Sequence, residues 1–361
     1  MFYNNHTFVI AEAGVNHNGS IDLAIQLIDV AVEAGADAVK FQTFKADQMM
    51  SGNAPKAEYQ TNGTNIDETQ FEMIRKLELN ESTHKTLTEY CNQREIEFLS
   101  TPFDIPSLDL LSTQFNLSRI KISSGDITNG PMLLKVAQKG KPVILSTGMS
   151  NLGEIEMALG ILAFGYMQSK EKPSLSAFRK AYCSEIGQKY LRENVVLLHC
   201  TTEYPAPFND VNLLAMDTLH NAFGLKVGYS DHTSGIAISI AAVARGAKII
   251  EKHFTLDRKL PGPDHKASLE PQELKEMIHS IRQVEIALGS PLKKLTESEE
   301  KNMLVARKSV VALTDIKKGK EFTSENIGIK RPGTETSPVF YWKLLGTLAS
   351  KDFRKDEVID L

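Results

Sequence analysis

The chain has 361 residues, of which 42% are hydrophobic and 24% are charged. This length suits one large barrel with a small extra domain, or two ordinary domains, and the hydrophobic content is sufficient for a sizeable core. No apolar run reaches the roughly 18 residues that predict a membrane span, and the first residues lack the features of a secretory signal. The three cysteines lie far apart in the sequence, which argues against a disulfide framework or a cysteine zinc site and favours a cytoplasmic location.

Charge is distributed unevenly along the chain. Residues 301–361 contain 12 Lys and Arg against 8 Asp and Glu, whereas the remainder contains 29 against 37. A basic tail beside an acidic body favours docking within or between chains, and it can help to hold an anionic substrate. No basic stripe is interleaved with aromatic residues, so we do not expect nucleic-acid binding.

Short β-branched or apolar runs alternate with longer amphipathic stretches along most of the chain. The predicted strands are Phe8–Ala13, Ala38–Gln42, Glu97–Thr101, Ile120–Ser124, Val143–Thr147, Val195–Thr201, Leu225–Ser230 and Ile249–Phe254. The predicted helices between and after them include Ile21–Ala34, Pro106–Gln114, Met132–Lys139, Leu152–Phe164, Val211–Phe223, Ile236–Arg245 and Pro271–Leu288. Eight strand–helix units in about 290 residues predict an α/β fold, the (β/α)8 TIM barrel. A doubly wound open sheet is the alternative, but the turn at Gly14–Gly19 lacks the glycine-rich fingerprint expected there.

Two stretches interrupt this pattern. Asp47–Gln70 is polar and too long for a plain connection, and loops of this length are often functional lids. Gly165–Glu193 is charged and partly helical, and we interpret it as a peripheral insertion without a chemical role.

The sequence predicts a barrel domain over residues 1–288, a linker over 289–306 and a small module over 307–361. The polar stretch Gly289–Asn302 marks the linker, and the module contains a short predicted strand, Ser309–Ala312. A module of this size cannot bury a large core of its own, so we expect it to pack on a barrel. We expect its aromatic cluster Phe340–Trp342 to belong to its core.

Polar residues stand at the carboxyl end of every predicted barrel strand, where barrel enzymes place catalytic groups. They are Glu12, Asn16, His17, Lys40, Gln42, Ser100, Thr101, Lys121, Ser123, Ser124, Asp126, Ser146, Thr147, His199, Thr202, Glu203, Tyr204, Ser230, Asp231, His232, Glu251, Lys252, His253, Asp264 and His265. Any one of them has a structural explanation, and we treat His17 and His199 as structural. Packing alone does not explain the whole set, because each buried charge needs a partner.

Two chemistries follow from these residue types. Lys40 and Lys121, with hydroxyls at Ser124, Ser146 and Ser230, suit a phosphate, because ammonium groups and hydroxyls both donate to its oxygens. The alternative is a pair of structural salt bridges.

His232 and His253 end adjacent predicted strands and can share one divalent metal that stays partly open to water and substrate. The alternative is two hydrogen-bonded core histidines. Glu12 and Asp264 are candidate acid–base or hydroxyl-binding carboxylates, and Glu203 and Glu251 are candidate supporting partners.

Nine segments together form a pattern that extends over nearly the whole chain: Ile10–Ser20, Val39–Thr43, Leu99–Asp104, Leu145–Met149, His199–Pro205, Gly228–Thr233, Glu251–Thr255, Gly262–Asp264 and Lys330–Gly333. In this pattern the chain resembles the bacterial sialic acid synthases, which include N-acetylneuraminate and N,N'-diacetyllegionaminate synthases. The tail is similar to the antifreeze-like (SAF) module of that family.

This resemblance implies a domain-swapped homodimer that joins phosphoenolpyruvate to an open-chain N-acetylmannosamine-type aldehyde. It implies Mn²⁺ or Mg²⁺ at His232 and His253. It also implies phosphate contacts at Lys40, Lys121, Ser124, Ser146 and Ser230, and sugar contacts at Gln42, Tyr204, Asp264 and the partner's Arg331. Glu12 and Asp126 match carboxylates near the reacting carbons.

Three departures from the family pattern stand out. Asp126 replaces a more usual Glu, Gly333–Thr336 replaces a Gly-Asn-Gly sequence, and Gly165–Glu193 is an addition. The competing activities are a Schiff-base pyruvate aldolase using Lys40, Lys121 or Lys252 and a non-catalytic ice- or carbohydrate-binding protein. The sequence leaves open whether the acceptor is N-acetylmannosamine or 2,4-diacetamido-2,4,6-trideoxymannose.

Overall fold

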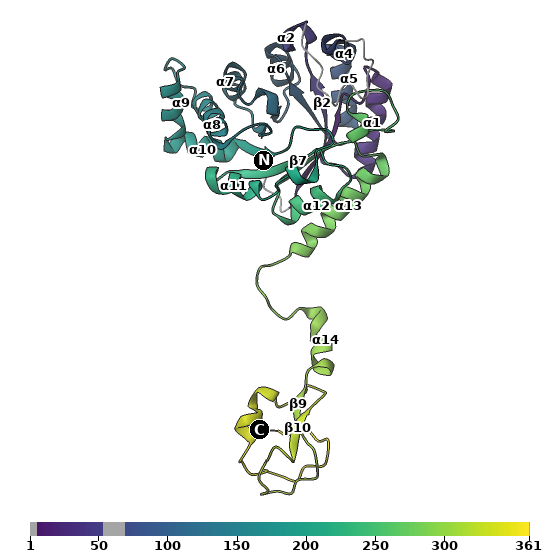
Figure 1. Ribbon diagram of the computed structural model, residues 1–361, viewed down its shortest axis with the longest axis vertical. Helices are drawn as coiled ribbons and strands as arrows, with labels where there is room; N and C mark the ends of the chain where they lie inside the picture. Colours follow the sequence, from purple (N-terminus) through teal and green to yellow (C-terminus); the bar gives the residue numbers. More distant parts are fainter. Residues whose placement is uncertain (1–5, 53–68, 361) are drawn as a thin grey trace. The chain divides into compact units, whose positions relative to one another are not determined.

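The computed structural model describes residues 6–52 and 69–360 and divides the chain into two compact units, Met1–Gly289 and Ser290–Leu361 (Figure 1). The central part of the predicted lid, residues 53–68, lies outside the described residues.

The first unit contains an eight-stranded parallel sheet that curls into a nearly closed barrel. Its strands are β1 Phe8–Gly14, β2 Ala38–Thr43, β3 Glu97–Pro102, β4 Ile120–Ile122, β5 Val143–Ser146, β6 Val195–His199, β7 Lys226–Asp231 and β8 Ile249–His253. The hydrogen-bonded order is β3-β2-β1-β8-β7-β6-β5-β4, and β3 and β4 at its two ends contact each other. The predicted (β/α)8 barrel is therefore confirmed, and the open doubly wound sheet is not.

Helices cover the outside of the barrel (Figure 1). The helices of this unit are α1 Ile21–Ala34, α2 Ala46–Met49, α4 Gln70–Lys76, α5 Glu81–Gln93, α6 Ile105–Asp109, α7 Gly130–Gln138, α8 Leu152–Tyr166, α9 Leu175–Tyr182, α10 Glu185–Asn194, α11 Ala215–Phe223, α12 Ala237–Ala244 and α13 Pro271–Leu288. Of these, α2 and α4 lie at the carboxyl ends of the strands, beside the cavity described below. Local chemistry sets their ends. In α1, the Ser20 hydroxyl accepts from the Leu23 amide at 3.4 Å, and Gly35 ends the helix at a φ of 81°, a conformation that favours glycine.

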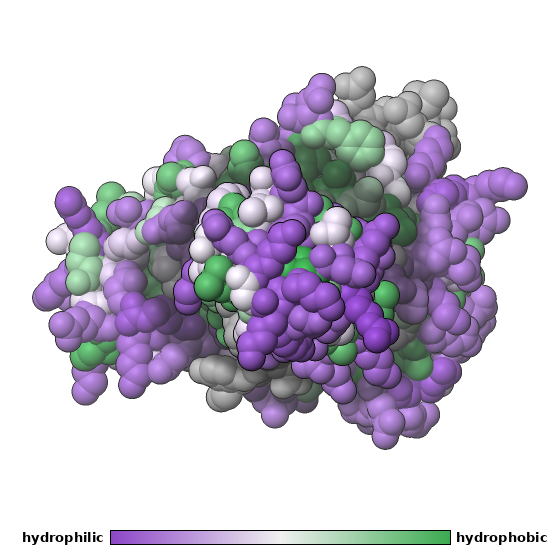
Figure 2. Space-filling model, turned by 90° about the horizontal axis from the view of Figure 1, so that it is seen from below, coloured by the Kyte–Doolittle hydropathy of each residue, from purple (hydrophilic) through white to green (hydrophobic). Residues whose placement is uncertain are grey.

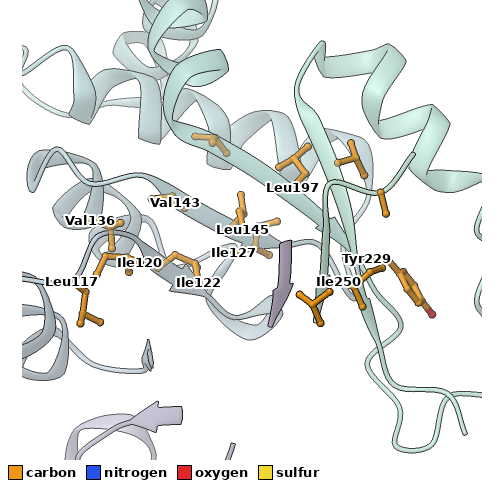
Figure 3. Close-up of a cluster of buried hydrophobic side chains, with 14 of the residues drawn as sticks. Leu117, Ile120, Ile122, Ile127, Val136, Val143, Leu145, Leu197, Tyr229 and Ile250 are labelled. Atoms are coloured by element: carbon orange, nitrogen blue, oxygen red, sulfur yellow. The ribbon is translucent and has the colours of Figure 1, made fainter. Parts of the chain in front are cut away.

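Side-chain alternation along the strands creates two apolar layers. Outward-facing strand residues and the helices form the main core, part of which Figure 3 shows around Ile120, Leu145 and Tyr229. The inward-facing residues form a smaller apolar cluster inside the barrel: Ile10, Ala38, Leu99, Ile144, Val196, Leu198 and Ile249. Because side chains alternate with a period of two, the next inward positions toward the carboxyl ends are Glu12, Lys40, Thr101, Ser146 and Glu251.

Several boundaries differ from the sequence prediction. The predicted helix at Pro106–Gln114 is split into α6 and a π-helical turn, Leu110–Gln114. The predicted fourth strand ends at Ile122, because a 3₁₀ turn follows at Ser124–Asp126. The insertion supplies α9 and α10, which pack against α8 on the outside of the unit.

The second unit has its own small core. Strand β9 Ser309–Ala312 pairs antiparallel with β10 Ile327–Lys330, so the predicted strand is confirmed. The predicted linker includes a helix, α14 Glu297–Ala306, which buries no side chain. The prediction for the aromatic cluster is wrong in part: Tyr341 packs on the core, but Trp342 is 76% exposed and Phe340 is 42% exposed.

Hydrophilic residues dominate the face shown in Figure 2, with hydrophobic ones scattered among them. Among the described residues, no helix is both long and apolar enough to span a bilayer.

Gly228 fixes the close packing of the barrel interior, which generates a stability prediction. A Cβ atom at this β7 position would lie 2.5 Å from the Ile249 carbonyl oxygen and 2.7 Å from Leu198 Cδ2, so the backbone would have to shift. We expect Gly228→Ala to destabilise the barrel by about 1–3 kcal/mol and to lower its melting temperature by roughly 2–10 °C in a thermal scan. Gly52→Ala is the matched control, because a Cβ there meets nothing within 4 Å among the residues that the structure describes. Equal melting temperatures for the two variants would contradict this account.

Candidate active site

The carboxyl ends of the barrel strands surround a cavity of about 300 Å³. This volume lies at the low end of the range for small-molecule sites. The inward-facing residues described above form its floor, and loop residues complete its wall. The predicted site residues that line it are Glu12, Lys40, Gln42, Lys121, Ser124, Ser146, Tyr204, Ser230, His232, His253 and Asp264.

A buried charge network joins two lysines through one carboxylate. Lys40 Nζ lies 2.7 Å from Glu12 Oε2 and 3.6 Å from Glu251 Oε2. Lys121 Nζ lies 3.6 Å from Glu251 Oε1, so Glu251 stands between the two ammonium groups. All four side chains are at most 6% exposed.

Hydroxyl groups complete this network. Lys40 Nζ donates to Thr101 Oγ1 at 3.0 Å, and Lys121 Nζ donates to Ser146 Oγ at 2.7 Å. Ser230 Oγ donates to Glu251 Oε1 at 2.9 Å. Lysines and hydroxyls from five different strands therefore converge on one side of the cavity, which is the donor set that a phosphate requires.

The surroundings shift the pKa values of the two glutamates, Glu12 and Glu251, in opposite directions. Burial raises the pKa of Glu12 above its usual value, although Lys40 acts against this. Burial also opposes ionisation of Glu251, but Lys121 and Lys40 outweigh it and hold the pKa of Glu251 below its usual value. Near neutral pH, Glu251 is therefore the charged partner of the lysines, and Glu12 is the carboxyl that can carry a proton.

The two lysines also differ. Burial disfavours the charged form of both, but Glu12 and Glu251 hold the pKa of Lys40 above its usual value. The pKa of Lys121 is lowered, because burial outweighs the attraction of Glu251.

His232 and His253 lie side by side at the cavity, with ring centroids 5.8 Å apart. His232 Nδ1 donates to the Thr201 carbonyl at 2.5 Å, which leaves Nε2 with a free lone pair facing Ser230 Oγ at 3.3 Å. His253 Nδ1 is buried and has no hydrogen-bond partner among the described residues. Burial lowers the pKa of His232 to about 4 and that of His253 well below its usual value, so both rings are neutral at pH 7.

Neutral imidazole nitrogens of this kind are metal ligands, so the residues present fit a divalent cation. In residues 6–52 and 69–360, no group of three His, Cys, Asp or Glu is arranged to hold a metal. The protein would therefore supply two nitrogen ligands from His232 and His253 and leave the other positions to water or substrate.

Three further predicted residues lie beside the histidines. Tyr204 packs on His232 at 4.2 Å between ring centroids and meets His253 edge-on at 5.6 Å. Asp264 Oδ2 lies 3.8 Å from His253 Nδ1, and burial raises its pKa to about 6. Gln42 Nε2 donates to Glu12 Oε1 at 3.4 Å.

The absence of a side chain at Gly14 allows Glu12, Asp264 and His253 to lie close to one another around the backbone of this residue. A Cβ at Gly14 would lie 3.3 Å from Glu12 Oε1 and 3.4 Å from both Asp264 Oδ2 and His253 Cε1. The residue also has a φ of +53°, which a larger side chain rarely adopts.

Two predicted residues of the first unit, Asp126 and Glu203, do not line the cavity. Asp126 does not line it, because its carboxylate accepts from Ser123 Oγ at 2.7 Å and Asn129 Nδ2 at 3.1 Å. Arg331 belongs to the second unit, where it is exposed. Glu203 is also exposed.

His17 and His199 make the structural hydrogen bonds expected of them. His17 Nδ1 accepts from the Gly19 amide at 2.9 Å, and His199 Nε2 bonds to the Val211 carbonyl at 2.6 Å.

The central place of Glu251 was not recognised from the sequence, which gave it only a supporting part. The signal was available: Glu251 stands two residues before His253, so strand alternation puts both on the inner face. Lys252 between them points outward, where its Nζ lies 3.0 Å from Asp231 Oδ2 and both side chains are at most 1% exposed.

Comparison with known proteins agrees with this architecture. The sequence model of the NeuB family matches residues 27–293, and that of the SAF domain matches residues 307–361. An N,N'-diacetyllegionaminic acid synthase from Campylobacter jejuni is 52% identical over 353 residues, which cover 98% of each chain. A second N,N'-diacetyllegionaminic acid synthase, from Legionella pneumophila, is 45% identical over 95% of this chain and 90% of its own.

A solved structure supports the same assignment. The N-acetylneuraminic acid (sialic acid) synthetase from Leptospira borgpetersenii, in complex with citrate, superposes with a TM-score of 0.65 at 33% identity, over 83% of this chain and 91% of that one. The resemblance drawn from the sequence is thus confirmed: the chain belongs to the NeuB family and ends in a SAF domain.

Proposed function

We propose that this chain condenses phosphoenolpyruvate with an N-acetylmannosamine-type amino sugar to form a nine-carbon sialic-acid-type sugar acid, with release of phosphate. Two relatives, at 52% and 45% identity, are N,N'-diacetyllegionaminic acid synthases, which favours 2,4-diacetamido-2,4,6-trideoxymannose as the acceptor. The observation that carries the proposal is the meeting of Lys40 and Lys121 at Glu251, beside two neutral histidines in one cavity.

Phosphoenolpyruvate binds on the lysine side of the cavity. Its phosphate and carboxylate accept from Lys40 and Lys121 and from the hydroxyls of Ser146 and Ser230, which already converge there. The Ser124 hydroxyl, which accepts from the Gly148 amide at 3.0 Å, adds a further donor on this side. Because these donors are held by strands of one barrel or by the turn after β4, little reorganisation is needed when the anion arrives.

The sugar aldehyde binds on the histidine side, near Gln42, Tyr204 and Asp264. A Mn²⁺ or Mg²⁺ ion at His232 and His253 would polarise the aldehyde oxygen when bound. Glu12 lies next to this position and has a raised pKa, so its neutral carboxyl can donate a proton to the oxygen that becomes a hydroxyl.

The bonds change in a defined order. Carbon 3 of phosphoenolpyruvate forms a bond to the aldehyde carbon, and the enol oxygen supplies the electrons, which leaves carbon 2 electron-deficient. Water then adds to carbon 2 and loses a proton, and the bond between carbon 2 and the bridging oxygen breaks. Phosphate leaves with that oxygen, and the product retains the oxygen of water as its ketone or hemiketal.

A Schiff-base aldolase remains the alternative chemistry for a lysine in this barrel. Lys252 is paired with Asp231 outside the barrel interior, and Lys40 is held in its charged form, so neither suits imine formation. Lys121 has the lowered pKa that such a reaction requires. Lys121 is thus the lysine on which the two reactions can be distinguished. Borohydride treatment with pyruvate modifies it if the enzyme is an aldolase and leaves it unmodified if the enzyme condenses phosphoenolpyruvate with the sugar.

Isotopic labelling tests the proposed reaction directly. With phosphoenolpyruvate carrying oxygen-18 in the bridging position, we expect amino-sugar-dependent phosphate release, and mass spectrometry should find the label in phosphate. The reason is that water attacks carbon 2 and the carbon–oxygen bond breaks. Label in the sugar acid would exclude this mechanism, and no phosphate release with either N-acetylmannosamine or 2,4-diacetamido-2,4,6-trideoxymannose would exclude the function.

Substitution of the histidines tests the metal site. Either His232→Ala or His253→Ala removes one of the two nitrogen ligands, so we expect phosphate release to fall by more than ~100-fold with manganese present. Circular dichroism melting should stay close to that of the wild type, and exposed His279→Ala, on α13, is the matched control. Near-normal turnover of both variants after chelator treatment would rule out this metal site.

Arg331 is proposed to complete the site of the other subunit in a domain-swapped homodimer. The second unit is small and basic, and the barrel unit carries the opposite net charge, which favours docking. Loss of a charged hydrogen bond to the sugar predicts a roughly 10- to 150-fold weaker use of the sugar by Arg331→Ala, with a smaller change for phosphoenolpyruvate.

Subunit mixing distinguishes a swapped site from a site within one chain. Arg331→Ala chains are combined with Lys121→Ala chains, so that each swapped heterodimer has one site with both changes and one with neither. After full exchange, activity should recover to about a quarter of wild type, since half of the dimers are mixed and half of their sites are intact. Exchange without recovery would show that Arg331 does not act across the dimer.

A further inference from the structure

The cavity has an apolar wall that the proposed reaction does not use. Its members are Val15, Met49, Met50, Ile74 and Phe103. They belong to a separate hydrophobic cluster with Phe44, Ala46, Met73 and Leu77, formed by the segments after β1, β2 and β3 and by α4. We call these five residues the apolar wall.

The apolar wall lies nearer to the mouth of the cavity than the two lysines. Its residues come from the segments that follow β1, β2 and β3 and from α4, whereas Lys40 and Lys121 lie within β2 and β4. Gln42 stands two residues beyond Lys40 in β2, and Asp264 follows β8, and both line the same cavity. A sugar held by Gln42 and Asp264 therefore lies beyond the lysines, beside the apolar wall.

The two candidate acceptors differ in the groups they present there. N-acetylmannosamine carries hydroxyls at carbons 4 and 6. In 2,4-diacetamido-2,4,6-trideoxymannose, carbon 6 is a methyl group and carbon 4 carries a second acetamido group, which ends in another methyl.

We propose that the apolar wall makes this enzyme selective for the 6-deoxy, 4-acetamido sugar over N-acetylmannosamine. This inference rests on the proposed function. A methyl group packed against Met49, Met50 or Ile74 is removed from water, which is favourable. A hydroxyl in the same place loses its hydrogen bonds to water and has no hydrogen-bonding partner among these side chains, which is unfavourable.

The expected discrimination is substantial but bounded. One methyl group in an apolar pocket changes kcat/KM by roughly 10- to 200-fold. Methionine side chains are unbranched and adaptable, which suits contacts with two methyl groups at different positions on one sugar.

The test compares kcat/KM for the two sugars in phosphate release at saturating phosphoenolpyruvate. We expect the wild type to favour the 6-deoxy sugar by at least ~10-fold, and Met49→Gln combined with Met50→Gln to reduce that preference by about 10-fold or more. Both side chains are half-buried, so a polar group can be accommodated in the free enzyme. The double substitution to Leu should retain the preference, because it keeps the wall apolar.

Two further variants complete the design. Met157→Gln, on α8 outside the cavity and 42% exposed, is the matched control and should leave the ratio unchanged. Val15→Thr exchanges one methyl of the apolar wall for a hydroxyl at nearly constant shape, and it tests the same idea if the double Gln variant does not fold.

The outcomes separate the two proposals. No phosphate release with either sugar would overturn the proposed function. Release with both sugars, at a ratio that is near one in the wild type or unchanged in folded Gln and Thr variants, would leave the function in place and overturn selection by the apolar wall.

Discussion

The carboxylate of Glu251, placed between Lys40 and Lys121, is the constraint on which the rest of the site depends. Removing charged groups from water is unfavourable, and a buried ion pair is tolerated only when each charge has its partner. Inside the barrel, an apolar cluster fills the space on the amino-terminal side of these charges, so the lysines have no water there. Carboxylates and hydroxyls serve as their partners in its place. The same arrangement suits the proposed anionic substrate, because a phosphate can take over the hydrogen bonds of both lysines, whereas a neutral ligand would leave them without compensation.

The strands that carry the histidines hold charges on both faces. Inward, Ser230 and Glu251 bond across β7 and β8. Outward, Lys252 pairs with Asp231, which also accepts from Thr233 and Ser239 hydroxyls at 2.8 and 2.6 Å. Asp231 and Lys252 each precede one of the two histidines in the chain, so the outer ion pair joins β7 to β8 at the point where the cavity needs His232 and His253 side by side. The spacing of the two imidazole rings is thus set by the outer ion pair as well as by the hydrogen bond between Ser230 and Glu251 inside the barrel.

Much of the barrel follows from the recurrence of short apolar runs between amphipathic stretches, which the sequence displays directly, and its inner polar residues follow from the polar ends of those runs. Lys40, Lys121, Ser146 and Ser230 were predicted together because they stand near the ends of predicted strands and all can donate to a phosphate. Glu251 was underestimated, since the sequence shows that a carboxylate faces inward but not which ammonium groups it meets. The position of Asp126 depends on a 3₁₀ turn and two local hydrogen bonds, which override the expectation from its neighbours. The apolar wall could not be predicted either, because its residues are distant in sequence and come together only through tertiary packing.

The two halves of the cavity are built from different kinds of structure. The charged half comes from the strands and the residues that immediately follow them, whose register is fixed by parallel pairing: Glu12 stands opposite both Lys40 and His253, and Ser230 opposite Glu251. A one-residue shift there would turn these side chains out of the barrel, so this half tolerates little change. The apolar wall comes from connecting segments and the short helix α4, which can change without disturbing the sheet. The chemistry common to all acceptors is thus tied to the register of the barrel, and the choice of acceptor is left to segments that can vary independently of it.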